Sequence, residues 1–391
     1  MKQIRIIKLV AVAAIATLPS HRLHAESVET AEPPKLQTRL EAQGRLVVNS
    51  RHQSGEDDDV HGFLIRRARA DFQGHTGNPD WTYRARVNAN TTDGNVKLEY
   101  AFIGMPLPGG FRAEAGQIKP QFAREESVNA FRQLAVERSY AADYFTVDFT
   151  QGAEFSKKAD RARAFLALHD GSYAANTDFN GDRTELGIAG RIEFVPAGRW
   201  EQFADFSSAR TDGLGCLLGL ALDYEIGEEG AATHTPDILK ATADASLEVH
   251  GFTLFGALYG QKFDDHDENH DSDLPDNLAD AEQYGIVLQA GTLLPPEGLE
   301  LFGRAELIEF DNLYYRNKGE DFQKASGSLA SDPLTILTTG LNYHMPKYNT
   351  KLSLDLVWAL DPVPCANTGA GLLDTLEDDQ SALRAQLQWR F

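Results

Sequence analysis

The chain has 391 residues, of which 58 are acidic and 37 are basic, so its formal net charge is −21 at pH 7. Its two cysteines are too few to build a disulfide-stapled scaffold in an exported protein. Beyond the N-terminal segment no run of about 20 apolar residues occurs, which excludes membrane-spanning helices. If this chain enters a membrane, it must do so as a closed barrel.

The N-terminus has the pattern of a secretory signal peptide. Lys2, Arg5 and Lys8 precede a short apolar run at residues 9–16, and Leu-His-Ala at 23–25 fits a cleavage site. The apolar run is too short to anchor the chain in a bilayer. We therefore expect residues 1–25 to be a signal peptide, residues 26–36 a flexible periplasmic lead-in, and residues 37–391 a single outer-membrane barrel.

From residue 37 onward, apolar and polar residues alternate in segments of roughly ten residues. The last segment is the clearest, because Leu387 and Trp389 fall on one face while Arg384 and Gln386 fall on the other. Short turns alternate with mostly longer, acidic links, as periplasmic turns and extracellular loops do in outer-membrane barrels. The pattern predicts an all-β fold, a transmembrane antiparallel β-barrel of about 16 strands. The expected strands are 37–51, 60–74, 80–91, 95–106, 111–119, 150–158, 161–169, 183–195, 213–226, 238–249, 252–264, 281–294, 298–310, 334–345, 349–361 and 381–391.

Two segments do not follow this pattern. Residues 200–208 could form one more strand, but an odd count would place the termini on opposite sides, so we interpret them as a periplasmic connection. Residues 120–151, between the fifth and sixth strands, are longer than a hairpin loop and have helical character around 125–140. We expect this loop to fold into the lumen and narrow the bore.

The inward loop carries three arginines and three glutamates, so part of its charge can pair internally. We assign anion contact to the arginines and prefer Arg124 as the constriction residue. The three candidates are Arg124, Arg132 and Arg138.

The early strands place basic residues on the polar face, with few acids among them, although acids outnumber bases in the whole chain. Any barrel lumen is polar, so scattered solvated cations are the simpler alternative. A basic stripe would nevertheless concentrate anions, because low-dielectric walls focus its field, and rings of Arg and Lys select anions in pores. The candidate residues are Arg45, Arg51, Arg67, Arg69, Arg84, Arg86, Lys97 and Arg112.

Three stretches carry a family resemblance: residues 63–72 (Phe-Leu-Ile-Arg-Arg-Ala-Arg-Ala-Asp-Phe), 116–122 and 136–139, followed by the aromatic C-terminal strand. In this order they resemble the phosphate-selective porin O and P family of Gram-negative outer membranes. The resemblance covers residues 40–200 best. It implies a homotrimer of sixteen-stranded barrels that passes small anions such as phosphate. The family's phosphate-binding lysine and arginine cluster has no residue-by-residue match here, so porin function is better supported than phosphate specificity.

The motifs of the chain bear on other functions. An enzyme is not expected, because the chain has neither a Gly-x-Ser-x-Gly elbow nor a His-Glu-x-x-His pair. Asp265, Asp267 and Asp271 are weak metal candidates in an acidic run that we interpret as a solvated extracellular loop near lipopolysaccharide. We expect outer-membrane lipid as a partner, and neither a cofactor nor a nucleic acid. A non-selective diffusion porin and a non-conducting structural or adhesive barrel remain alternatives, which the openness of the bore distinguishes.

Overall fold

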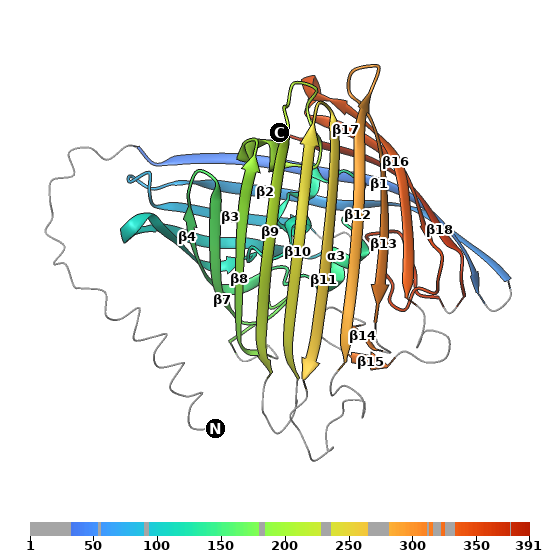
Figure 1. Ribbon diagram of the computed structural model, residues 1–391, viewed down its shortest axis with the longest axis horizontal. Helices are drawn as coiled ribbons and strands as arrows, with labels where there is room; N and C mark the ends of the chain where they lie inside the picture. The colour runs from blue at the N-terminus through green and yellow to red at the C-terminus, as the bar shows by residue number, and fades with distance from the viewer. Residues whose placement is uncertain are drawn as a thin grey trace, which may run out of the picture.

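The computed structural model describes residues 33–53, 56–89, 94–179, 184–227, 236–264, 281–310, 313–315, 322–324, 333–375 and 377–391. Within this part of the chain, sixteen antiparallel strands close into a barrel (Figure 1). Each strand pairs with its neighbours in sequence, and β18 pairs with β1 to close the ring. No helix among the described residues is both long and apolar enough to cross a membrane.

The barrel strands are β1 (Lys35–Gln53), β2 (Glu56–His75), β3 (Thr82–Ala89), β4 (Val96–Leu107), β5 (Phe111–Ile118), β6 (Thr150–Lys158), β7 (Ala162–His169), β8 (Thr184–Ala197), β9 (Gly215–Gly227), β10 (Asp237–Val249), β11 (Phe252–Asp264), β12 (Glu282–Leu294), β13 (Leu299–Glu309), β16 (Leu334–Met345), β17 (Thr350–Ala359) and β18 (Gln380–Arg390). Two short strands outside the barrel, β14 (Leu313–Tyr315) and β15 (Phe322–Lys324), pair with each other. The short turns contain η1 (Pro108–Gly110) and η5 (Pro346–Tyr348). The predicted sixteen-stranded barrel is confirmed, and 200–208 is a connection that contains the 3-10 helix η3 (Trp200–Ala204).

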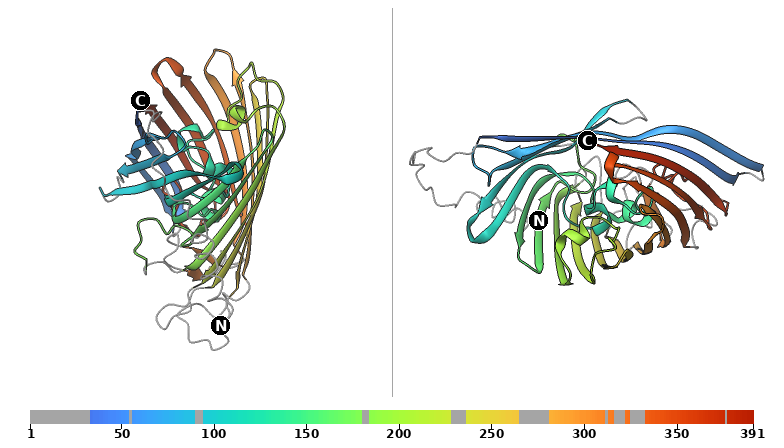
Figure 2. Two further views of the ribbon diagram at one scale, coloured as in Figure 1. Left: turned by 90° about the vertical axis from the view of Figure 1, so that its left-hand side faces the viewer. Right: turned by 90° about the horizontal axis from the view of Figure 1, so that it is seen from above.

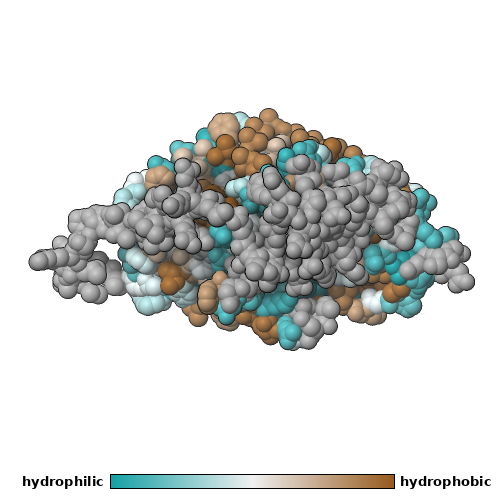
Figure 3. All heavy atoms as spheres, turned by 90° about the horizontal axis from the view of Figure 1, so that it is seen from below, coloured by the Kyte–Doolittle hydropathy of each residue, from teal (hydrophilic) through white to brown (hydrophobic). Residues whose placement is uncertain are grey.

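The alternation in the sequence becomes the two faces of the wall. On β18, Leu383 and Leu387 are 45% and 43% exposed on the outer face, whereas Arg384 is fully buried on the inner face. Large apolar side chains are exposed in the same way around the outer face of the barrel. Figure 3 shows apolar residues along the outer margins of the wall. This is the inverted pattern that a barrel in lipid requires.

The strands differ in length and direction. β1 and β2 have 19 and 20 residues, whereas β3, β5 and β7 have 8 each. In Figure 1, β1 to β4 run across the view, while β8 to β13 run nearly along its height. The seam between the first and last strands continues to the final residue, since the Phe391 N–H donates to the Leu40 carbonyl at 2.9 Å.

The loop between β5 and β6 lies inside the ring of strands, as the view from above in Figure 2 illustrates. It contains three short helices, α2 (Arg124–Ser127), η2 (Ala130–Arg132) and α3 (Tyr140–Phe145). The helical character expected around 125–140 takes the form of these short, separate helices. The side-chain amide of Gln133 and the guanidinium of Arg138 both donate to the carbonyls of Glu125 and Val128, which are therefore bonded to side chains rather than to a continuing helical backbone.

The inward loop packs against the wall formed by β11, β12 and β13. The rings of Phe145 and Tyr259 are stacked with their centroids 5.7 Å apart. Gly285 of β12 leaves room for this contact, because an added Cβ there would lie 2.6 Å from the Phe145 ring. The loop also bonds to β1 and β2, because Arg45 and Arg67 donate to its residue Glu137, so the side of the lumen that it leaves is that of β3 to β7.

Some expectations fall on residues that the structure does not describe. The predicted signal peptide and the lead-in up to residue 32 lie outside the described ranges, as do Asp265, Asp267 and Asp271. The barrel begins at Lys35, two residues before the expected boundary at 37.

Candidate functional site

Glu137 of the inward loop lies among three arginines of β1 and β2, and we name this group the Glu137 cluster. Its carboxylate accepts hydrogen bonds from Arg67 at 2.7 and 3.0 Å, from Arg66 at 2.8 Å and from Arg45 at 3.2 Å. Burial alone would raise the pKa of Glu137, but the three positive charges outweigh it and hold this pKa well below its usual range. The carboxylate is ionised at neutral pH and ties the loop to the wall.

A β-bulge places Arg66 in this cluster. On β1 the consecutive residues Gln43 and Gly44 pair with Arg67 and Ile65, so Arg66 is an extra residue on β2. Strict alternation would turn one of two consecutive arginines toward lipid. The bulge instead lets both guanidinium groups reach the loop carboxylate. Sequence reasoning missed Arg66, although two adjacent arginines in mid-strand were a usable signal, because an arginine that faces lipid is costly.

A second group, the Asp71–Glu99 cluster, lies on β2 to β4. Asp71 accepts hydrogen bonds from Arg84 at 2.8 and 3.0 Å and from Arg86 at 2.9 and 3.2 Å. Glu99 accepts from Arg69 at 2.7 and 3.0 Å and lies 3.5 Å from Arg86. Three arginines therefore share two carboxylates in this cluster.

Glu99 also occupies a bulge. Arg86 pairs with Tyr100 and the next residue of β3, Val87, pairs with Leu98, which leaves Glu99 as the extra residue of β4. Both bulges of the early strands thus add a charged side chain to the lumen.

Arg124, the expected constriction residue, is 5% exposed. Its guanidinium donates to the Ser246 hydroxyl at 2.8 Å and to the carbonyls of Phe203 and Asp205 at 3.0 and 3.2 Å. A buried guanidinium must direct its N–H groups at protein oxygens. The structure therefore places Arg124 as an anchor between the loop, β10 and the η3 connection, and this position does not fit the constriction role.

The other two loop arginines are half-buried. Arg138 lies 3.3 Å from Glu126 of the same loop and donates to backbone carbonyls. Arg132 donates to the Ala204 carbonyl at 3.4 Å. Internal pairing of the loop charges therefore occurs at Arg138, while Arg132 keeps part of its surface in water.

The remaining candidates lie toward the two ends of the lumen. Arg51 pairs with Asp58 at 2.9 Å. Arg112 lies 3.3 Å from Glu114 and also donates to the hydroxyl of Thr82. Lys97 is exposed near the start of β4.

The opposite wall, from β7 to β10, carries four paired carboxylates but only two permanent cations, an arginine and a lysine. Its side chains are at most 9% exposed, because they pair with one another. The contacts are Arg191 with Asp244 at 2.7 Å and Glu193 at 3.0 Å, Lys240 with Glu225 at 2.8 Å, and His169 with Asp223 at 2.9 Å.

Exposure differs between the two walls. Among the arginine side chains of β2, β3 and β5, Arg66, Arg84 and Arg112 are 31%, 22% and 29% exposed. Inward residues of β8 to β13 are buried by one another and by the inward loop. The accessible side of the lumen therefore lies along β3 to β7, with Arg66 of β2 at its edge. No group of three or more metal-ligating side chains occurs in the described part of the chain.

Comparisons with known proteins agree with this architecture. The family model described as phosphate-selective porin O and P matches residues 42–291. No curated protein sequence matches the chain.

Several solved porin structures are similar in fold. The anion-selective porin from Comamonas acidovorans has a TM-score of 0.59 at 13% identity, over 92% of this chain and 100% of that chain. OmpF of Salmonella typhi, in complex with daunomycin, has a TM-score of 0.58 at 14% identity, over 92% and 98%. OprB of Pseudomonas putida has a TM-score of 0.58 at 10% identity, over 91% and 94%.

Proposed function

The chain belongs to the phosphate-selective porin O and P family, and from this premise we propose that it conducts small anions such as phosphate in preference to cations. Members of the family are outer-membrane channels and not enzymes, so the chain is a porin. The anion preference is the part of the proposal that goes beyond membership of the family.

The composition of the two arginine clusters supports this preference. Together they contain six arginines and three carboxylates, a formal excess of three positive charges. We name these six residues the arginine wall: Arg45, Arg66, Arg67, Arg69, Arg84 and Arg86. Their carboxylate partners neutralise only part of the field.

The single observation that carries the proposal is the difference in exposure. Arg66 and Arg84 keep 31% and 22% of their side-chain surface accessible, while their partners Glu137 and Asp71 keep 7% and 1%. A permeating ion therefore meets guanidinium groups before carboxylates. In a low-dielectric passage this arrangement attracts anions and repels cations.

The test is a reversal potential in planar bilayers under a potassium chloride gradient. We expect the wild-type channel to reverse on the anion-selective side. Replacing Arg66 and Arg84 with glutamine should lower the anion-to-cation permeability ratio, because both charges face the passage. We expect a decrease of about fivefold to tenfold, the effect of roughly 1–1.4 kcal/mol in barrier difference at an effective dielectric of about 20.

Lys347→Gln is the matched control, since it removes a positive charge from the exposed turn between β16 and β17. It should leave the reversal potential unchanged. A cation-selective wild-type channel would exclude the anion preference, and an unselective one would favour the general diffusion porin.

Two further parts of the proposal concern assembly and export. We propose a homotrimer, as one similar structure, OmpT of Vibrio cholerae, is described as a trimer form with a TM-score of 0.54 at 11% identity. Light scattering of the detergent-solubilised protein measures this directly. We also propose export through a signal peptide at residues 1–25, which N-terminal sequencing of the membrane-inserted protein would check.

A further inference from the structure

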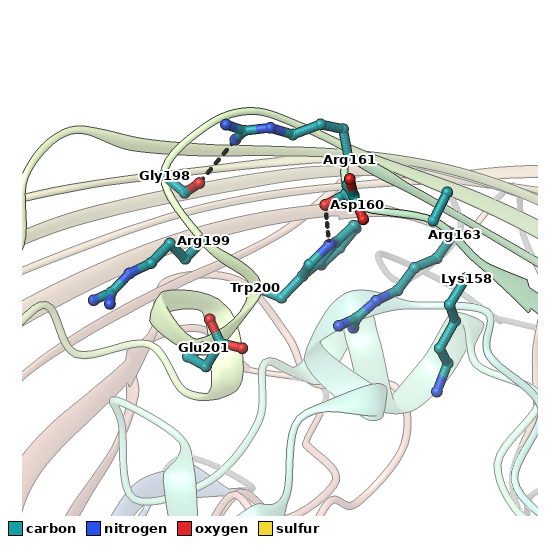
Figure 4. Close-up of a pocket in the computed structure, with 9 residues that line it drawn as sticks. Lys158, Asp160, Arg161, Arg163, Gly198, Arg199, Trp200 and Glu201 are labelled. Atoms are coloured by element: carbon teal, nitrogen blue, oxygen red, sulfur yellow. Dashed lines mark hydrogen bonds between the residues drawn. The ribbon is translucent and has the colours of Figure 1, made fainter.

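The turn after β6 and the connection after β8 line an open cavity of about 650 Å³ at the short-turn, periplasmic end of the barrel (Figure 4). Basic side chains and one indole dominate its lining, and two acids, Asp160 and Glu201, also contribute. The basic and aromatic residues are Lys158, Arg161, Arg163, Arg199 and Trp200.

Neutral groups hold two of these cations in place. Arg161 donates to the Gly198 carbonyl at 2.8 Å. The guanidinium carbon of Arg163 lies 3.7 Å from the centre of the Trp200 ring. The indole N–H of Trp200 donates to the Asp160 carbonyl at 2.8 Å and so fixes the ring, as Figure 4 shows. The cavity thus presents a positioned aromatic ring beside a positioned positive charge.

Charge pairing distinguishes this cavity from the arginine wall. Every arginine of the wall has a carboxylate oxygen within 3.5 Å. Among the described residues, none of the four cations of the cavity has a carboxylate oxygen within 4.0 Å. Glu193 and Glu201 act on Arg163 electrostatically without bonding to it. The guanidinium groups therefore keep N–H donors for a ligand, which makes the cavity an anion site.

The wall from β4 to β7 carries aromatic rings at half-exposed inward positions. Tyr100 of β4 lies under the Arg84 guanidinium, with 4.1 Å between the guanidinium carbon and the ring centre. Phe102 follows on the same face, 5.9 Å from Tyr100. Phe165 is the next inward residue to Arg163 on β7. Porin lumens are generally polar, so aromatic rings are unusual there. Rings that alternate with cations along the accessible side suit a solute that contacts a ring and a positive charge together.

We propose that the cavity binds small planar organic anions, specifically aromatic carboxylates. The carboxylate pairs with the guanidinium groups of Arg161 or Arg163, and the aromatic ring packs against Trp200. Inorganic phosphate has the charge but no apolar face, so it gains nothing from the indole. The inference rests on the proposed anion-conducting function and adds a solute class and a binding site to it.

The experiment compares three anions added to the periplasmic side of channels in a planar bilayer that carry chloride current. Benzoate has charge and ring, acetate has charge alone, and inorganic phosphate is a hydrated polyanion. We expect benzoate to reduce the current at a lower concentration than acetate or phosphate. Replacing Trp200 with leucine should raise the half-blocking concentration of benzoate about threefold to tenfold, the effect of losing one aromatic contact, with little change for acetate.

Two variants separate ring from charge and guard against misfolding. Arg163→Gln should weaken block by benzoate and acetate together, because both use the cation. Trp81→Leu is the matched control, since Trp81 is 41% exposed on the turn between β2 and β3 and does not line the cavity. Trp200→Phe should restore most of the benzoate preference, and the heat-dependent gel shift of the folded barrel checks that each variant folds.

Equal block by benzoate and acetate in the wild type would overturn the proposal. The same holds if Trp81→Leu acts as strongly as Trp200→Leu, or if phosphate blocks as well as benzoate and neither responds to Trp200→Leu. Reversal potentials from the same membranes report the proposed function separately. Anion selectivity without benzoate preference rejects only the cavity, and benzoate preference in a cation-selective channel rejects only the selectivity.

Discussion

Single residues decide which charges face water in this lumen. The alternation in the sequence correctly turned Arg45, Arg67 and Arg384 inward, because one face of each strand must meet lipid. It could not assign Arg66, whose direction depends on a bulge in the pairing of β1 with β2. Nor could it place Arg124, because the oxygens that bind it come from residues about 80 to 120 positions later. Side-chain partners across the lumen are not encoded in local periodicity.

Glu137 is the residue whose loss should be most damaging to the inward loop. Replacing it with glutamine leaves three arginines without their shared counter-charge. We expect a cost of about 3–5 kcal/mol, typical when one partner of a buried ion pair is removed. The cost should appear as lower hydrogen-exchange protection of the loop segment, while the barrel strands stay protected.

The same residue gives a signed pH dependence. The folded-state pKa of Glu137 is depressed, so its stabilising contribution is complete above the unfolded value of about 4.3 and is lost as pH falls through the folded pKa. The protection factors of the loop amides, which are corrected for the intrinsic pH dependence of exchange, should therefore stay constant from neutral pH down to about 4.5 and fall only below it. In Glu137→Gln this acid-dependent step should be absent, and a step that persists would assign it to another carboxylate.

At the scale of elements, strands were predictable and the inward loop was only partly so. The period of two is local, and β6, β11 and β16 begin and end where the alternation does. The path of the loop depends on contacts with β11 to β13, such as that of Phe145 with Tyr259. The sequence could predict that the loop enters the lumen from its length, but not which wall it covers.

Gly285 provides a test of this packing. In Gly285→Leu the new side chain would occupy the position of the Phe145 ring, 2.6 Å from its Cβ, and push the loop away from β12. The loop would then move toward β3 to β7, so single-channel conductance should decrease. Overpacking of this kind costs about 1–3 kcal/mol. Gly303→Leu is the control, because Gly303 has only Thr338 within 4 Å of its added Cβ; an equal loss of conductance there would contradict the mechanism.

At the scale of the whole molecule, parity predicted the closed ring and the connection at 200–208, because an even number of strands returns both ends to one side. The position of the open passage was not predictable. It follows from the side that the inward loop covers, which long-range packing determines.

The net charge of −21 and the arginine wall have opposite signs, and salt should separate their effects. The Debye length falls from about 10 Å at 0.1 M salt to about 3 Å at 1 M. We expect the anion-to-cation permeability ratio to fall toward one across this range, because water reaches the exposed guanidinium groups. Reversal potentials at a fixed gradient ratio and increasing mean salt measure it. A ratio independent of salt would locate the selectivity at buried, unscreened charges.

The bulges at Arg66 and Glu99 have a consequence for how such channels can diversify. Each adds one residue to one strand, after which pairing resumes and the flanking apolar side chains still face outward. A one-residue insertion can therefore change the charge inside the pore by one unit while the membrane-facing surface stays compatible with lipid. Solute preference and membrane insertion, which share every strand, can in this way vary independently.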